Sequence, residues 1–435
     1  MLIGVLIAAF SIYAAVSVVR PAWGLYAILA LLPAYQLRFS VFGLPTTFLE
    51  GLLLILTVVT IFQAFRLKAW RTKLRKLTWP IFFILLFVAA GAISVLVSPV
   101  FLKALGVFKA YILEGAVFWL LCLLLIDSKT KLYRCLGALG FLVVYLSLFG
   151  IYQFFTLYHL PPSWWGPGVE PRRIVSLFTY PNAVSLLITP ILAMFTALFF
   201  LAQTGNDSER REERSVFLPK SFLTIVNLSG IVLLILTFSR GAWIGYIASI
   251  IFLLLFTKYK KTILLALGIG VLGLLIIPVS RARLLPVFLG TDPAGQERFK
   301  LWHKAGEIIG ASPVFGSGLM GFRDWYGALR QINTDEILNY PHNFFLNFWV
   351  ETGLFGLLAV ISMLAWTAAK AQGFYRMHIE SRPVVIATLS AWVALVVHGQ
   401  FDSPFFKNDL AILFWFLLVI IPALYSINTS QEASK

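Results

Sequence analysis

The sequence predicts an all-α integral membrane protein with about 12–13 transmembrane helices and one long, partly helical extracytoplasmic loop. The first observation is composition: 60% of the 435 residues are hydrophobic and 12% are charged, whereas a soluble domain is about 25% charged. The second is that the apolar residues fall in blocks of about 17–25 positions, the length a helix needs to cross ~30 Å of hydrocarbon. The third is that basic residues cluster in every second loop. Blocks of this length favour helices over a membrane β-barrel.

About thirteen apolar segments follow one another along the chain. The first two are separated only by Arg20 and Pro21, so a re-entrant hairpin is an alternative that would lower the number of spanning helices. The segments cover residues 2–19, 22–37, 47–65, 79–98, 104–126, 134–157, 182–203, 221–238, 241–257, 262–279, 342–369, 383–400 and 409–427.

These segments divide the chain into three parts. Residues 1–279 hold about ten transmembrane helices, residues 280–341 form a large extracytoplasmic loop, and residues 342–435 hold the last helices and a short cytoplasmic tail. The loop contains a predicted amphipathic helix over residues 296–310, followed by a glycine-rich turn. The first apolar block lacks a basic start and a small-residue cleavage site, so we expect it to be retained. The two cysteines flank one short loop and predict neither a disulfide framework nor a cysteine metal site.

The loop charges predict the orientation. Residues 66–78 carry six Lys or Arg and no acidic residue, and four further basic loops are spaced so that every second loop is positive. The positive-inside rule places these loops in the cytoplasm and the loops between them, including 158–181 and 280–341, outside. Because the basic residues are dispersed over separate loops, the formal net charge of +16 does not predict a nucleic-acid partner. The four further basic loops are residues 127–134, 204–220, 258–261 and 370–382.

Polar residues gather where three helices should begin at the outer face, near Asn182, Gly241 and His342, and Arg240 directly precedes the second start. A helix N-terminus presents free N–H groups and a partial positive charge. Arg172 and Arg173 precede the first of these starts. Arginine binds phosphate bidentately and keeps its charge. Together these features predict an anion site, and at this depth the expected anion is a lipid-linked phosphate or diphosphate.

Each of these residues also has a structural interpretation. Arg240 alone could anchor a helix end at the lipid headgroups, and Arg172 and Arg173 could be ordinary loop charges. Asn182 is a good helix N-cap, and His342 alone is more often a capping or interface residue than a base.

Four further ionisable residues are candidates. Glu114 and Glu351 lie within apolar segments, where an acid is a functional candidate by default. Glu114 either pairs with Lys109 or faces the same cavity. His398 and Asp402 end the twelfth segment on the outer side, where a local hydrogen bond between them is the alternative to a functional role.

Several motifs follow one another in a fixed order between residues 170 and 405. They are Arg173 with Pro181-Asn182, the run LILTFSRGAWIG, Arg298 and Trp302 with Pro313 and Gly316-Ser317-Gly318, His342-Asn343, Glu351-Thr352-Gly353 with Gly356-Leu357, and His398 with Asp402. In this order the chain resembles the O-antigen ligase/polymerase family of bacterial envelope glycan enzymes. One departure is Ser176, where the family often has glycine.

The resemblance implies a reaction and a location. The donor would be a glycan on undecaprenyl diphosphate in the bacterial cytoplasmic (inner) membrane, with the active site facing outward and membrane lipid around the helices. An acceptor sugar hydroxyl, on a glycan or glycolipid, would attack the anomeric carbon and displace the lipid diphosphate. The product would belong to lipopolysaccharide or another surface polysaccharide.

The resemblance also assigns roles. Arg173 and Arg240 would bind the diphosphate, and His342 would be the base or orient the acceptor. The helix N-terminus should keep His342 neutral and able to accept a proton. The other substrate-binding candidates are Arg172, Asn182, Arg298, Asn343 and Glu351, of which Arg172 could substitute for Arg173. No cofactor is implied. No Asp-x-Asp pair occurs in the predicted outer loops, where Asp335-Glu336 are the only adjacent acids, so no catalytic metal is predicted.

Other functions stay open. Ligases, polymerases and protein-glycosylating relatives would share the donor site and differ in the acceptor. A transporter or flippase of lipid-linked glycan would also have many helices and a basic cavity, but no internal repeat is visible and the polar groups gather at one face. A non-catalytic membrane assembly protein would leave the outer arginines unexplained.

Overall fold

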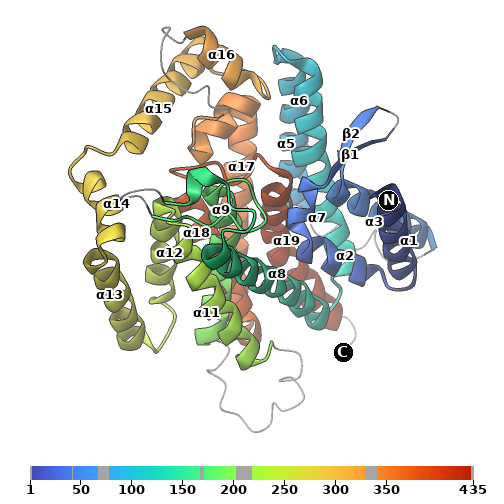
Figure 1. Cartoon of the computed structure of the whole chain (residues 1–435). Coiled ribbons are helices and arrows are strands. Elements are labelled where there is room, and N and C mark those ends of the chain that lie inside the picture. The colour runs from blue at the N-terminus through green and yellow to red at the C-terminus, as the bar shows by residue number, and fades with distance from the viewer. Residues whose placement is uncertain are drawn as a thin grey trace.

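A computed structural model describes residues 2–41, 43–66, 78–166, 171–201, 218–329 and 340–432 (Figure 1). The chain is 80% helical. The described strands form one antiparallel hairpin, β1 (Arg38–Val41) with β2 (Leu44–Thr47). Most of the predicted basic loops 66–78 and 204–220, and Asp335-Glu336, lie outside the described residues.

The helices follow in chain order. They are α1 (Leu2–Val19), α2 (Pro21–Ala30), η1 (Leu32–Gln36), α3 (Phe48–Arg66), α5 (Thr78–Val97), α6 (Phe101–Val107), the π-helix η2 (Phe108–Leu113), α7 (Glu114–Leu125), α8 (Lys129–Thr156), η3 (Pro162–Trp164), α9 (Pro181–Leu201), α11 (Lys220–Leu236), α12 (Arg240–Leu253), α13 (Lys260–Ile276), α14 (Pro278–Phe288), α15 (Pro293–Ala311), α16 (Gly321–Leu329), α17 (Phe344–Met377), η5 (Ile379–Ser381), α18 (Arg382–His398) and α19 (Asn408–Glu432).

Among the described residues, seven helices are long and apolar enough to cross a membrane. They confirm the predicted all-α membrane fold, but they are fewer than the 12–13 spanning helices expected. Five shorter apolar helices of 10–17 residues account for part of the difference, because at 1.5 Å per residue they extend only about 15–26 Å. The seven are Thr78–Val97, Phe101–Leu125, Lys129–Thr156, Pro181–Leu201, Phe344–Met377, Ile379–His398 and Asn408–Asn428.

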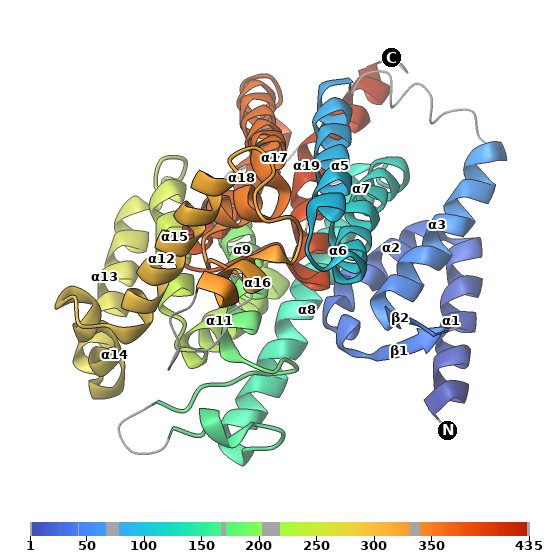
Figure 2. The same ribbon diagram turned by 90° about the horizontal axis from the view of Figure 1, so that it is seen from above.

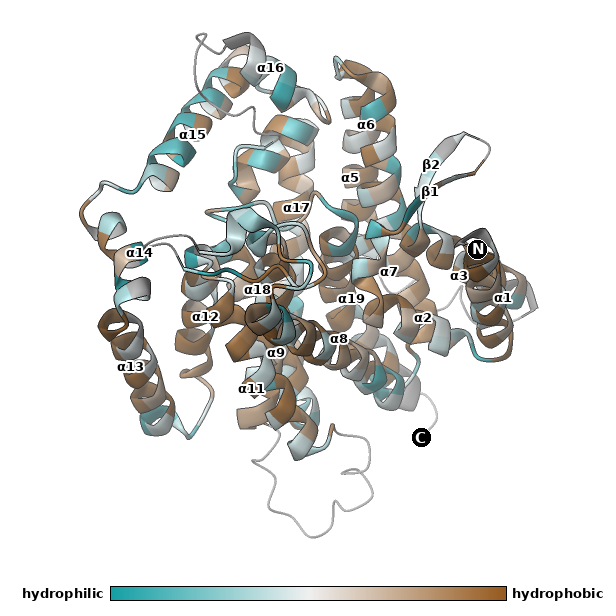
Figure 3. Cartoon of the chain, viewed as in Figure 1, coloured by the Kyte–Doolittle hydropathy of each residue, from teal (hydrophilic) through white to brown (hydrophobic). Residues whose placement is uncertain are grey.

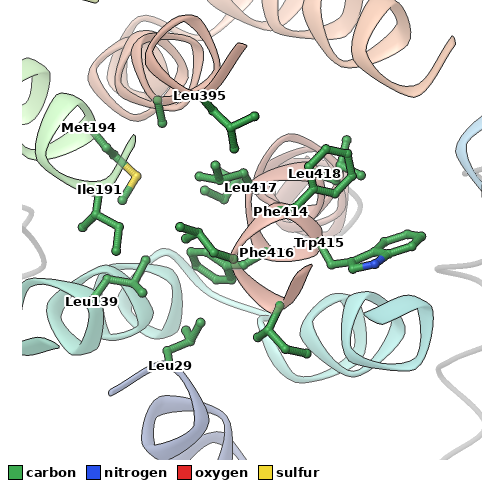
Figure 4. Close-up of a cluster of buried hydrophobic side chains, with 14 of the residues drawn as sticks. Leu29, Leu139, Ile191, Met194, Leu395, Phe414, Trp415, Phe416, Leu417 and Leu418 are labelled. Atoms are coloured by element: carbon green, nitrogen blue, oxygen red, sulfur yellow. The ribbon is translucent and has the colours of Figure 1, made fainter. Parts of the chain in front are cut away.

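Helix α19 forms the centre of the bundle. In its most apolar stretch, 94% of the residues are buried inside the protein, and the corresponding share for α9 is 89%. Side chains from α2, α8, α9 and α18 pack around Phe414 to Leu418 (Figure 4). Trp415 also packs against Gly115, where a side chain would collide with the indole. The indole N–H donates to the Tyr111 carbonyl in the π-helix η2 at 3.0 Å, so the buried polar group is satisfied.

Helices α13, α14 and α15 lie on the opposite side of the bundle from α1–α3 (Figures 1 and 2). Helix α15 extends the amphipathic helix predicted over residues 296–310 and confirms it. Its apolar side, Leu301, Ala305 and Ile308, is buried against α16 and α17. Its remaining surface is largely hydrophilic, whereas α13 is mostly hydrophobic (Figure 3). The large loop is therefore anchored through the C-terminal half of α15.

The glycine-rich turn after α15 packs on a kink in α17. Gly316 and Gly318 have positive φ angles of 65° and 78°, and Gly353 inside α17 has a φ of 70°, a region that glycine occupies without strain. A side chain at any of the three would collide with backbone atoms of the neighbouring segment. Oε2 of Glu351 accepts the Met320 N–H at 2.5 Å. Glu351 thus ties this turn to α17.

Candidate functional site

A cavity of about 390 Å³ lies where α9, α12, α14, α15 and the end of α18 meet. Its size falls within the range of small-molecule sites, roughly 300–1,000 Å³. It brings together six of the eleven predicted site residues, which come from four segments of the chain. These are Arg173, Asn182, Arg240, Arg298, His398 and Asp402.

Contacts from several segments hold Arg173 in place at the cavity wall. Its Nε donates to the Thr237 carbonyl at 2.8 Å, its Nη2 donates to Oδ1 of Asn182 at 3.0 Å, and its guanidinium lies 5.0 Å from the Trp164 ring centre. Thr237 ends the apolar run that precedes Arg240, so these contacts join the first two predicted motifs. An arginine fixed in this way presents its charge without having to reorganise.

Arg240 begins α12, directly after a turn in which Phe238 has a φ of 48°. Its fork contacts Asp292 with both ends: Nη1 lies 2.7 Å from Oδ1 and Nη2 lies 2.8 Å from Oδ2. Nη1 also donates to the Arg283 carbonyl at 3.0 Å. Arg240 therefore faces the cavity and the large loop. Its contacts are with protein groups, Asp292 and Arg283, and differ from those of an arginine that anchors a helix end at the lipid headgroups.

Glycines in α12 allow the close approach of α18. A methyl group on Gly241 would lie 3.0 Å from Cδ2 of His398, and one on Gly245 would lie 2.7 Å from the Ala394 carbonyl oxygen. Small residues one turn apart let membrane helices approach closely. This spacing places His398 against the start of α12 at the cavity wall.

Replacing Gly245 by alanine is expected to lower the free energy of unfolding by about 1–3 kcal/mol, because overpacking forces the backbones apart. Thermal unfolding in detergent measures the effect. Gly268→Ala in α13 is the matched control, since no heavy atom lies within 4 Å of the added methyl group. Equal unfolding midpoints for the two variants would contradict the packing argument.

His342 and Asp402 form a pair at the edge of the cavity. Nδ1 of His342 lies 2.9 Å from Oδ1 of Asp402, the Ser403 N–H donates to the same oxygen at 2.9 Å, and Nδ2 of Asn182 lies 3.4 Å from Oδ2. Burial raises the pKa of Asp402, but the charge and hydrogen bond of His342 outweigh it and hold the pKa below its ordinary value. The sequence offered His398 as the local hydrogen-bond partner of Asp402. In the structure the Asp402 carboxylate instead bonds to His342.

The lowered pKa of Asp402 predicts how stability depends on pH. A carboxylate with a lowered pKa contributes stability above its unfolded pKa, about 3.9, and loses it as the pH falls through the folded value. The difference in unfolding free energy between wild type and Asp402→Asn should therefore be present at about pH 5 and shrink as the pH falls below about 4. Unfolding in detergent below about pH 5 measures it, and a difference that grows as the pH falls below about 4 would contradict the pairing.

Five predicted residues do not line the cavity. Arg172 points away and donates to the Phe154 carbonyl at 2.6 Å. Asn343 accepts from the N–H groups of Phe345 and Leu346 and caps α17. Glu114 lies 3.3 Å from Lys109, the local pairing given as its alternative.

The other two of these five residues, Glu351 and His342, lie outside the cavity lining for different reasons. Glu351 binds the glycine-rich turn, as described above. His342 lies beside the cavity through its bond to Asp402, which is itself a lining residue.

Two charged lining residues, Arg283 and Asp292, were missed from the sequence, and Trp302 was named there only as part of a motif. Asp292 carried a usable signal, because Asp followed by Pro293 is typical of a helix N-cap. Its carboxylate caps α15 by accepting the Gly295 N–H at 2.7 Å. Arg283 had no signal beyond an ordinary loop charge.

The cavity suits an anion. Four arginines line it with two acidic residues, Asp292 and Asp402, and its aromatic side chains include Phe299 and Trp302. Across the described parts of the chain, no group of three or more His, Cys, Asp or Glu is arranged to hold a metal ion. The arrangement offers charge stabilisation and one imidazole–carboxylate pair.

Fold and cavity together define a multi-pass helical membrane protein with an arginine-lined pocket. Residues 225–361 match the model of the family described as O-Antigen ligase. The match supports, over these residues, the resemblance read from the motifs. The match contains Arg240, Arg298 and His342 and ends before Asp402. None of the curated proteins compared with the chain matches it.

Proposed function

We propose that this O-antigen ligase-like protein transfers a glycan from undecaprenyl diphosphate to an acceptor sugar hydroxyl at the extracytoplasmic face of the bacterial cytoplasmic membrane. The observation that carries the proposal is the convergence of Arg173, Arg240 and Arg298 on one cavity that also contains Asp402, the partner of His342. The product would be a lipopolysaccharide or another surface polysaccharide.

The arginines would bind the donor diphosphate and stabilise it as the leaving group. When the bond between the anomeric carbon and the phosphate oxygen breaks, its electron pair goes to the diphosphate. Fixed guanidinium groups placed where this charge develops lower the barrier. Arg173 is already oriented by Thr237 and Asn182, so it needs little reorganisation.

The His342–Asp402 pair would activate the acceptor. Asp402 favours the tautomer in which Nδ1 carries the proton and donates to the carboxylate, because the carboxylate accepts only. Nε2 is then the acceptor for the hydroxyl proton as the hydroxyl oxygen attacks the anomeric carbon. Asn182 contacts both Arg173 and Asp402, so one side chain couples the diphosphate site to the base.

The charges of the described residues support an outward-facing cavity. The cavity lies at the start of α12 and the end of α18, and α17 begins at the same end, beside His342. Helix α17 carries Arg376 in its last turn, at the far end from the cavity. Lys258, Lys260 and Lys261 likewise follow α12 at its far end. Basic residues at this end agree with a cytoplasmic location.

Transfer is tested directly in proteoliposomes that contain a glycan on undecaprenyl diphosphate and a soluble acceptor glycan. The proposal expects acceptor-dependent release of undecaprenyl diphosphate together with a lengthened acceptor. Movement of the donor between leaflets without cleavage would instead support a transporter. Neither cleavage nor movement, with candidate acceptors of both glycolipid and glycan type, would favour an assembly role.

Metal independence is a further expectation. Transfer measured after treatment with a chelator should keep at least about half its rate, because arginines replace a divalent ion in neutralising the leaving diphosphate. A buffer that contains the chelator already saturated with Ca²⁺ serves as the control. Loss of transfer that is restored only by Mg²⁺ or Mn²⁺ would refute this expectation.

A further inference from the structure

The fork of Arg240 is already occupied in the protein without ligand. Both terminal nitrogens bind the Asp292 carboxylate, at 2.7 and 2.8 Å, and the two side chains are only 16% and 15% exposed. A carboxylate presents two oxygens to a guanidinium in the same way that a phosphate group does. Asp292 therefore stands where a bound phosphate would have to stand in order to use this fork.

The two anions exclude each other. If Arg240 kept Asp292, a diphosphate beside it would meet a like charge in a partly buried site, which is unfavourable. If Arg240 binds the diphosphate through the Nη1–Nη2 edge, Asp292 has to leave. Nη1 also donates to the Arg283 carbonyl, so the other bidentate edge is Nε–Nη2, and a phosphate bound there would lie beside the Asp292 carboxylate and meet its charge.

The surroundings of Asp292 allow it to leave. Gly290, with a φ of 69°, joins α14 to the start of α15. The C-terminal half of α15 is anchored by Leu301 and Ile308. The first turns are connected to the bundle by Asp292 and by Arg298, whose Nε donates to the Phe401 carbonyl at 2.7 Å. Release of Asp292 would therefore let the start of α15 move, while Arg298 and the buried residues of α15 keep the loop folded.

We propose that Asp292 is a specificity-determining residue that acts as a resident anion: it binds Arg240 in the empty site and is exchanged for the diphosphate of the donor. This inference rests on the proposed function. A ligand must compete with an intramolecular carboxylate, so a diphosphate displaces it while a monophosphate with fewer charges and contacts does not. Product release is helped in the same way, because Asp292 returns to Arg240 as the lipid diphosphate leaves.

Anion binding to the full-length protein in nanodiscs tests the exchange, with inorganic pyrophosphate and inorganic phosphate as probes and calorimetry as the readout. Wild type should bind pyrophosphate at least tenfold more tightly than phosphate. Asp292→Asn should bind phosphate about tenfold more tightly than wild type does, so that the preference for pyrophosphate shrinks. Asparagine is a good N-cap, so α15 keeps its start.

Glu297→Gln is the matched control. It removes one negative charge from the same helix, where Glu297 pairs with Lys300 and does not touch Arg240. Its affinities should stay within twofold of wild type. Equal effects of the two substitutions would mean that Asp292 acts only through overall charge and would overturn the exchange.

Hydrogen exchange over residues 290–298 provides a second readout. In wild type, pyrophosphate should speed exchange at the start of α15, and in Asp292→Asn exchange should already be fast without ligand. Slower exchange in wild type on binding pyrophosphate would overturn the inference. If wild type binds neither anion, the diphosphate site itself is wrong and the proposed function fails with it. If wild type binds pyrophosphate and Asp292→Asn is unchanged, only the role of Asp292 fails.

Discussion

Replacing Asp402 by asparagine is expected to lower the turnover number for glycan transfer by about 10³–10⁴-fold. The amide is uncharged, so it no longer stabilises the imidazolium that forms when His342 accepts the acceptor proton. His342 is then a weaker base for the attacking hydroxyl. The fold should persist, because asparagine has nearly the same volume and its one oxygen can take the place of Oδ1, which lies 2.9 Å from both Nδ1 of His342 and the Ser403 N in wild type.

Transfer in proteoliposomes at saturating donor measures this loss. Asp324→Asn in α16 is the control, since this acid is exposed and does not line the cavity. A higher Michaelis constant for donor, with an unchanged turnover number, would place Asp402 in donor binding. Full activity of Asp402→Asn would remove the His342–Asp402 pair from catalysis.

Replacing Arg240 by lysine is expected to lower the turnover number divided by the Michaelis constant for donor by about 10²–10³-fold. Lysine keeps the positive charge but replaces the planar fork by a single ammonium group. It therefore cannot bind two oxygens of a phosphate group in parallel. The size of the loss separates a bidentate role, which lysine abolishes, from a general attraction of anions, which lysine preserves.

The amount of each protein in the membrane should be normal, because Arg240 begins α12 and lies outside its buried apolar side. Arg281→Lys is the control: this arginine lies in α14, within the large loop, but is exposed and does not line the cavity. Activity of Arg240→Lys within about threefold of wild type would exclude Arg240 from the bidentate diphosphate role.

The helices could be predicted because the signal for each one is local. An apolar block of sufficient length forms a helix in lipid, since its own backbone must satisfy every hydrogen bond. Helix α15 could also be predicted from a local signal, because its apolar residues recur at helical spacing. Spanning length was harder to predict. Helices α2 and α12 end several residues before their apolar segments do, so the thirteen apolar segments correspond, among the described residues, to seven long helices and several short ones.

The site could be predicted only in part, because its contacts join residues far apart in the chain. Arg240 and Asp292 are 52 residues apart, and His342 and Asp402 are 60 apart. The sequence named three of these four as separate candidates but paired none of them. The choice between Arg172 and Arg173 is similar: they are neighbours of one chemical type, and only the carbonyls of Phe154 and Thr237 decide which one enters the cavity.

The order and composition of the chain by themselves determined that this protein is a helical membrane protein and that its motifs resemble those of the O-antigen ligase family, because hydrophobic length and motif order are properties of a sequence. The tertiary structure alone decided which arginines share a cavity, that Asp402 belongs to His342 rather than to His398, and that Asp292 occupies the fork of Arg240. Those facts depend on how α12, α15 and α18 approach one another. That approach is set by side-chain volumes, such as the missing side chains of Gly241 and Gly245, summed over many distant contacts.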